Sequence, residues 1–181
     1  MIWIILVILA LIVFVGVGVF NNITSLENRV ANSLGQIDVQ LKKRSDLVPN
    51  LVNTVKGYAT HESSVFENVT KARTQMQSAN TVEEKAVASS ALSGALRTVF
   101  AVAEAYPDLK ANVSFQQLQS ELTDLEDKIA YSRQFYNDTV LGYNNAITTI
   151  PGVFFAGPMG KVKKSMFEAS EGDRAVPAVQ F

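Results

Sequence analysis

The sequence predicts an all-α protein, in which an N-terminal transmembrane helix is followed by a long antiparallel up-and-down helical bundle of three to four helices. Three observations predict this fold. Residues 1–20 form an uncharged apolar run. Beyond it, apolar residues recur at helical spacing on one face. Prolines and capping residues divide the rest of the chain into helical segments. We expect an anchor at 1–21, the bundle at 22–150, an apolar and basic membrane-proximal segment at 151–164 and an irregular tail at 165–181.

Composition excludes several kinds of site. The 181 residues include no cysteine, which excludes disulfides, thiol nucleophiles and cysteine metal ligands. His61 is the single histidine, so a site that needs two histidine ligands is excluded as well. A net charge of −1 provides no broad basic face for nucleic acid. We therefore expect no cofactor, no metal and no nucleic-acid partner.

The apolar run is long enough for a membrane anchor. At a rise of ~1.5 Å per residue, residues 1–20 cover about 30 Å, the thickness of a bilayer core. A cleaved signal peptide is the alternative, but no positive region precedes the run and no A-x-A site follows it. Basic residues follow the span and none precedes it, which favours a cytoplasmic C-terminal domain. Because only Arg29 lies close to the membrane, the side of that domain is left open.

The first long helix contains a proline inside its apolar repeat. Pro49 lacks an N–H and clashes with the carbonyl four residues back, at a cost of ~3 kcal/mol in a helix interior. We expect a bend at this position that wraps the helix around the core. We expect the helix to break near Gly57–Glu62, where glycine, threonine, histidine and serines cluster.

Arg44 and Glu62 stand where the repeat requires apolar residues. Arg44 is either a snorkelling side chain, with a buried stem and a hydrated head, or part of a charge network inside the bundle. Glu62 presents the same choice, and at a helix start its charge would suit the helix dipole. The sequence leaves these alternatives open.

The break divides an apolar run that extends from Asn22 to Ala79, and two further helices follow this run. A capping box at Thr81 starts the first of them, which we expect to end at about residue 106, before a proline. A second box at Ser114 starts the last long helix, which we expect to continue to about Thr149.

The helix that follows the membrane span, from Asn22 to Gly57, and the last long helix match in length, at about 54 Å each. The match supports their antiparallel pairing. Placing Asn22 opposite Thr149 sets a register that is good to one helical turn. It predicts two polar pairs: Asp38 with Arg133, and Arg44 with Asp127, beside which lies Glu126.

The segment 151–164 combines aromatic and basic residues where the chain returns to the membrane surface. Phe154 and Phe155 precede three lysines, Lys161, Lys163 and Lys164. Aromatic side chains beside a basic cluster indicate contact with the membrane interface. A solvated turn is the alternative, because three lysines form only a modest cluster.

Five blocks of the sequence form a recognisable pattern. In order along the chain they are IDVQLKKRSDLVPNLV (37–52), VKGYATHE (55–62), VTKAR (69–73), AYPDLKAN (105–112) and SRQFYNDTVLGYN (132–144). Together these blocks resemble the LemA family of small, membrane-anchored, helical bacterial proteins. The resemblance implies a single-pass protein of the bacterial inner (plasma) membrane with a long antiparallel helical bundle and no agreed catalytic activity. Leu34-Gly35 departs from the aromatic-small pair that members often carry before the first block.

No group of residues converges on a catalytic site, so we expect a protein that is not an enzyme. His61 and Glu62 match half of a zinc-binding helix motif, but its second histidine is missing. The leading interpretation is a membrane-anchored helical scaffold that self-associates and organises or shapes the membrane. The alternative is an accessory subunit that docks on a membrane enzyme, protease or signalling complex. The expected partners are the lipid bilayer, further copies of the chain and, in the alternative, another membrane protein.

Two sets of residues are the candidate interaction sites. The first set consists of the polar and motif residues expected to set register within or between chains: Asp38, Arg44, Asp46, Pro49, Asn50, Glu62, Arg73, Arg133, Tyr136 and Asn137. The second set is membrane-proximal: Phe154, Phe155, Lys161, Lys163 and Lys164.

Overall fold

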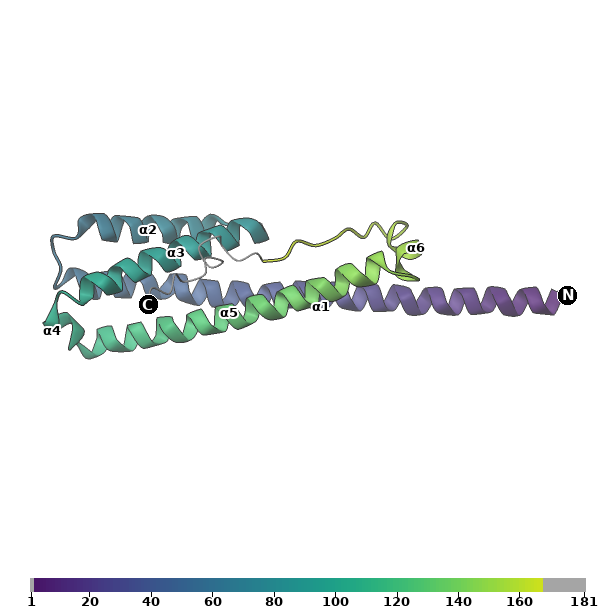
Figure 1. Ribbon diagram of the computed structural model, residues 1–181, viewed down its shortest axis with the longest axis horizontal. Coiled ribbons are helices and arrows are strands. Elements are labelled where there is room, and N and C mark those ends of the chain that lie inside the picture. The colour runs from purple at the N-terminus through teal and green to yellow at the C-terminus, as the bar shows by residue number, and fades with distance from the viewer. Residues whose placement is uncertain (1, 168–181) are drawn as a thin grey trace, which may run out of the picture. The chain divides into compact units, whose positions relative to one another are not determined.

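The computed structural model describes residues 2–167, and within them every regular element is a helix (Figure 1). The helices are α1 (Ile2–Lys56), α2 (Ser63–Ser78), α3 (Val82–Ala103), α4 (Pro107–Lys110), α5 (Val113–Thr148) and α6 (Gly152–Ala156). The all-α fold class and the long apolar N-terminal helix are confirmed. Most of the tail expected to be irregular, residues 168–181, lies outside the described residues.

The chain forms two compact units, and α1 and α5 contribute to both. The anchor unit contains α1 up to Gln36 together with Gln134–Met166. The bundle unit contains Ile37–Arg133 and also Phe167. Because α1 runs without a break past residue 21, the expected boundary between membrane anchor and bundle coincides with no end of a helix.

The bundle unit buries one apolar face from each of its long helices. In it α2 and α3 pack side by side (Figure 1). Arg44 of α1 meets Glu126 of α5, and Tyr58, just after α1, meets Asn112, just before α5, so these two helices are antiparallel. The register differs by one residue from the predicted one, which is less than a helical turn. The buried apolar side chains include Ile37, Leu41, Val48, Leu51, Val55, Phe66, Val69, Leu92, Leu96, Val99, Phe115, Leu122 and Ile129.

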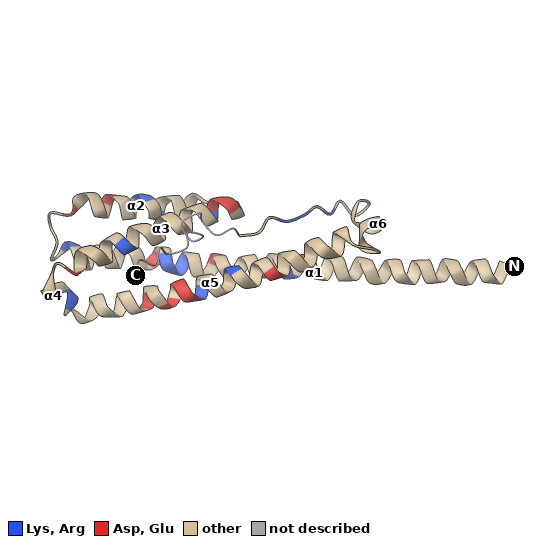
Figure 2. Cartoon of the chain, viewed as in Figure 1, with Lys and Arg blue, Asp and Glu red and all other residues tan. Residues whose placement is uncertain are grey.

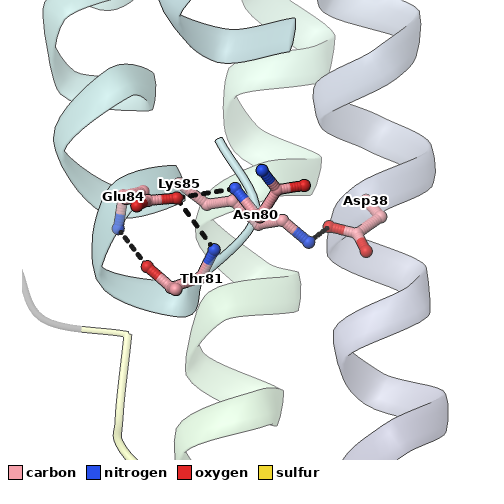
Figure 3. Close-up of polar contacts among 5 residues, drawn as sticks. All are labelled: Asp38, Asn80, Thr81, Glu84 and Lys85. Carbon is pink, nitrogen blue, oxygen red and sulfur yellow. Dashed lines mark hydrogen bonds and ion pairs between the residues drawn. The ribbon is translucent and has the colours of Figure 1, made fainter. Parts of the chain in front are cut away.

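Helix ends in the bundle unit follow local signals, with one correction. The break between Lys56 and Ser63 lies where it was predicted. At α3 the Thr81 hydroxyl accepts from the Glu84 amide at 3.1 Å, and the Glu84 carboxylate accepts from the Thr81 amide at 3.1 Å, which completes the capping box (Figure 3). The predicted box at Ser114 is wrong. Asn112 caps α5 instead, since its side-chain oxygen accepts from the Phe115 amide at 3.1 Å.

The anchor unit contains the apolar part of α1. Its most apolar window has a mean hydropathy of 3.2 and is not buried by the rest of the described chain. Figure 2 colours no acidic or basic residue on this part of the helix. α3 also passes the length and composition test for a membrane span, but its hydropathy is lower, at 1.4, and it packs against α2. The N-terminal part of α1 is therefore the stronger candidate span.

The core of the anchor unit consists of α1 and α5 side chains: Ile23, Val30, Tyr136, Val140, Tyr143 and Ile147. α6 follows α5 after a tight turn at Gly152, where an added Cβ would lie 1.8 Å from the Ala146 carbonyl oxygen. Only glycine permits this approach of backbone to backbone. The turn brings the Phe155 ring against Gly16 of α1, where an added Cβ would lie 3.1 Å from the ring.

Candidate functional site

Arg44 lies at the centre of a polar network in the bundle unit. Its side chain is 2% exposed. Nη2 donates to Ser93 Oγ of α3 at 2.8 Å, and Nη1 lies 2.8 Å from Glu126 Oε2 of α5 as an ion pair. Ser93 Oγ in turn donates to Glu126 Oε1 at 3.0 Å. Of the two alternatives for Arg44, the structure therefore shows the charge network, with Glu126 as the partner in place of Asp127.

Burial lowers the pKa of the Arg44 guanidinium, and the Glu126 carboxylate opposes this effect. Nε has no hydrogen-bond partner among the described residues. A cation in this environment depends on its partners, because removal of one leaves an uncompensated buried charge. The network therefore favours the arrangement in which α1, α3 and α5 all contribute their groups.

Asp38 pairs with Lys85 of α3, so the predicted Asp38–Arg133 pair is wrong. Lys85 Nζ lies 2.6 Å from Asp38 Oδ1 (Figure 3). Lys85 follows the capping box directly, so the start of α3 places its side chain against α1. The predicted register considered α1 and α5 alone, and α3 supplies the nearer cation. The Arg133 guanidinium instead lies 4.8 Å from the centre of the buried Phe167 ring.

Arg73 serves the Ser45 carbonyl that Pro49 leaves without a donor. The missing N–H of Pro49 leaves the Ser45 carbonyl oxygen, four residues earlier, without its helical donor. Arg73 of α2 donates to this oxygen from Nε at 2.9 Å. α1 continues through Pro49 to Lys56, so the proline does not end the helix. A bend at Pro49 stays a prediction.

The remaining motif residues occupy varied positions. Asp46 pairs with Lys42 at 3.4 Å on the exposed face of α1, and Asn50 is exposed. Glu62 is the N-cap residue of α2, although its side chain makes no capping bond. Tyr136 donates to the Ser165 carbonyl at 2.9 Å in the anchor unit. Asn137 is half-buried on α5.

Two of the three membrane-proximal lysines bind an acidic residue of α1. Glu27 lies 2.5 Å from Lys161 Nζ and 3.4 Å from Lys164 Nζ. The hydrogen bond from Lys161 lowers the pKa of the Glu27 carboxyl, and the same bond raises the pKa of Lys161. Lys163 is exposed. The basic cluster is therefore partly neutralised within the protein.

Residues 161–166 form a strap on α5 of the anchor unit. Asn144 holds the Lys164 backbone on both sides: its Nδ2 donates to the Lys164 carbonyl at 3.0 Å, and its Oδ1 accepts from the Lys164 amide at 2.9 Å. The Tyr136–Ser165 bond adds a third attachment. The first residues of the expected irregular tail are thus fixed by side chains, although they form no helix or strand.

Four residues that make these contacts were not predicted from the sequence: Glu27, Lys85, Ser93 and Asn144. Asn144 lies inside one of the matched blocks, and the length-matched register pointed to the neighbourhood of Glu126. Lys85 and Ser93 belong to α3 and contact α1. The sequence pattern does not predict which face of α3 packs against α1, so these two contacts could not be predicted from it. Among residues 2–167, no group of three His, Cys, Asp or Glu residues lies close enough to hold a metal ion.

These features define a class: an all-helical protein with a candidate N-terminal membrane helix and buried polar contacts that link its helices. A model of the LemA family matches residues 33–181. The chain belongs to the LemA family.

The relatives of this chain carry two kinds of name. It is 28% identical to protein LemA of Metamycoplasma hominis, over 89% of this chain and 74% of the relative. It is 25% identical to magnetosome protein MamQ of Magnetospirillum gryphiswaldense, over 80% of this chain and 63% of the relative. It is 24% identical to magnetosome protein MamQ 2 of Paramagnetospirillum magneticum, over 90% of this chain and 70% of the relative.

Proposed function

We propose that this chain is a non-enzymatic, membrane-anchored helical scaffold that self-associates through α3. One observation carries the proposal. α3 buries one face in the bundle unit and leaves on another an exposed, uncharged stripe, which consists of Val87, Ala91, Gly94, Thr98 and Ala101.

The stripe has the spacing of a helix–helix contact. Its members follow each other at intervals of four, three, four and three residues, which keeps them on one side of a helix. Small residues allow another helix to approach closely. Val87, at 72% exposure, is the one large apolar side chain in the stripe. A groove of about 420 Å³ along α2 and α3, lined in part by Ala91 and Gly94, offers room for a side chain of a second copy.

The polar motif residues support a structural role. Arg44, Asp38 and Arg73 each contact a helix other than their own. Groups used in this way hold helices in register. The proposal assigns them no part in a reaction.

The apolar part of α1 supports anchoring in a lipid bilayer. We place the protein in the inner membrane of a bacterium as a single-pass protein, with the bundle unit on the cytoplasmic side, as the distribution of basic residues favours. In this location self-association would gather anchors in one patch of membrane and so organise it. Two relatives are named magnetosome proteins, and a role in organising a cellular structure is proposed for this chain too.

The test is the particle mass of the full-length protein in mild detergent, measured by mass photometry. We expect a uniform particle of several copies, and we expect Gly94→Glu to reduce it to single chains, because the substitution places a charge in the stripe. A Cβ added at Gly94 would meet no neighbouring side chain within 4 Å, and a circular-dichroism melt of the variant checks that its fold is retained. Ser120→Glu, at an exposed position on α5, is the matched control and should leave the mass unchanged.

A wild-type monomer would overturn self-association and direct attention to the accessory-subunit alternative, to be tested by adding candidate membrane partners. A large particle that survives Gly94→Glu would keep the scaffold but remove α3 as its contact face.

A further inference from the structure

α6 and the residue before its turn expose apolar side chains in the anchor unit. Ile150 is 77% exposed, Val153 45% and Phe154 69%. Phe155, the next residue, rests on Gly16 of α1. The exposed group thus lies beside the apolar run of α1, which is itself unburied.

The contact with Gly16 sets the depth of α6 relative to the end of the apolar run. Asn21 is the first polar side chain of α1. Gly16 precedes it by five residues, which corresponds to about 7 Å along the helix axis. If the apolar run spans a bilayer, α6 lies on the hydrocarbon side of the boundary.

The following strap lies on the other side of that boundary. Lys161 and Lys164 bind Glu27, which follows Asn21 by six residues, or about 9 Å along the axis. The chain therefore passes from polar surroundings at the end of α5, through an apolar turn, and back to a charged cluster. This order matches the change from hydrocarbon to headgroups and water.

Several backbone amides of the turn bond to carbonyls within it, which lowers the cost of placing them in hydrocarbon. The Val153 amide donates to the Thr149 carbonyl at 2.9 Å, and the Phe154 amide donates to the Pro151 carbonyl at 3.2 Å. The Met159 amide donates to the Phe155 carbonyl at 3.1 Å. The Lys161 amide donates to the Ala156 carbonyl at 2.9 Å, so the end of the turn is bonded to α6 as well.

We propose that α6 is inserted into the bilayer as a second, shallow membrane contact, in the leaflet where α1 leaves it, with lipid acyl chains covering Ile150, Val153 and Phe154. The occupant is lipid because the apolar surface is continuous with the candidate span and because the flanking charges lie on its polar side. The inference rests on the membrane anchor of the proposed function and extends it: the protein occupies more of one leaflet than of the other.

The test uses tryptophan as a depth reporter, in the full-length protein reconstituted in phosphatidylcholine vesicles. Trp3 is the single tryptophan of the chain, so the wild type reports on the span. In a Trp3→Phe background, Phe154→Trp reports on α6. Val162→Trp in the same background is the matched control, because Val162 is equally exposed, at 67%, but lies within the strap.

We expect lipid brominated near the headgroup to quench the reporter at 154 strongly and aqueous acrylamide to quench it weakly, with the reverse at 162. Strong acrylamide quenching at 154, with Trp3 still quenched by lipid, would overturn the insertion and leave the anchor intact. Quenching at 154 by neither agent would also overturn it, since protein would then cover α6. Loss of lipid quenching at Trp3 itself would overturn the anchor and the inference together.

A second pair of variants tests the contact between Phe155 of α6 and Gly16 of α1. Gly16→Val should displace the Phe155 ring and shift the reporter at 154 toward water. Gly18→Val should not, because a Cβ added at Gly18 would meet no neighbouring side chain within 4 Å. Equal effects of the two substitutions, or no effect of Gly16→Val, would show that the Phe155–Gly16 contact does not set the depth of α6.

Discussion

Arg44 shows how a charged side chain can occupy an apolar seam. Its guanidinium is buried, whereas the Glu126 carboxylate that faces it is 48% exposed. The two partners therefore differ in what their loss entails. Without Glu126 the buried cation loses its counter-charge, but without Arg44 the carboxylate can still be hydrated.

This asymmetry predicts that Glu126→Ala lowers the free energy of unfolding more than replacement of Arg44 does. We expect Glu126→Ala to lower the free energy of unfolding by about 2–3 kcal/mol, and Arg44→Met, which fills a similar volume, to change it by less than about 1 kcal/mol. Urea unfolding of the protein in mild detergent gives both values. Asp124→Ala, at an exposed position on the same helix, is the control. A larger loss from Arg44→Met than from Glu126→Ala would contradict the argument.

Pro49 and Arg73 form a second residue-scale unit, because the arginine serves the carbonyl that the proline leaves without a donor. We expect Arg73→Ala to cost about 1–2 kcal/mol in the wild type and distinctly less in a Pro49→Ala background, where the restored N–H of residue 49 can serve Ser45. A double-mutant cycle of unfolding free energies measures the coupling. Equal costs in the two backgrounds would show that Arg73 acts independently of the proline.

At the scale of elements, the strap 161–166 is held by an ion pair whose pH range follows from its two groups. The Glu27 pKa lies below its ordinary value of 4.5, so its contribution is complete above 4.5 and is lost as the pH falls through the lowered value. The Lys161 pKa lies above its ordinary value of 10.5, so its contribution is complete below 10.5 and is lost above the raised value. The pair therefore operates across the neutral range and fails first at acid pH under ordinary conditions.

We accordingly expect the strap to loosen at acid pH before the bundle unit does. The protection factor of the Lys164 amide in hydrogen exchange should fall as the pH drops below 4.5, the ordinary pKa of Glu27, whereas that of the Val69 amide in α2 should not change in this range. In Glu27→Gln the Lys164 protection should already be reduced at neutral pH and should lose its acid dependence. Unaltered protection in that variant would show that Asn144 and Tyr136 hold the strap without the ion pair.

Elements with local signals were predictable from the sequence, and those fixed by distant partners were not. Thr81 and Glu84 satisfy each other within one turn, so their pattern alone predicts the start of α3. Ser114 had the same local pattern, but Asn112 was available as a cap and placed the start of α5 two residues earlier than the box would have. The strap has no helical or strand periodicity in its sequence. Asn144 and Glu27 determine its path, and neither residue lies within it.

At the scale of the whole molecule, the sequence predicts a membrane anchor and an antiparallel pairing of long helices. The register of α1 and α5 was close because both helices are long and their ends are well marked. The division into two units was not predictable, since the apolar repeat of α1 continues unchanged past Gln36, where one unit ends. The partner of Asp38 was missed because length matching compares two helices and omits the third.

The orientation in the membrane is testable because the chain has no cysteine. A cysteine introduced by Ser120→Cys is unique, and it is exposed on α5. In bacterial spheroplasts we expect a membrane-impermeant maleimide to label it only after lysis, since the basic residues that follow the span favour the cytoplasmic side. A permeant maleimide should label it in both states. Labelling of intact spheroplasts by the impermeant reagent would place the bundle unit outside.

The bond between Lys161 and Glu27 joins residues 134 positions apart. At synthesis rates of roughly 5–20 residues per second, the ribosome needs on the order of ten seconds after making Glu27 before Lys161 exists. The N-terminal apolar run is available for membrane insertion throughout this interval, whereas the anchor unit still lacks its strap and α6. A nascent chain that stalls or is cut short before residue 150 would therefore retain its apolar run and the bundle helices up to Arg133. It would lack Phe167 of the bundle unit and both α6 and the strap of the anchor unit. Such a difference is one that quality-control proteases could recognise.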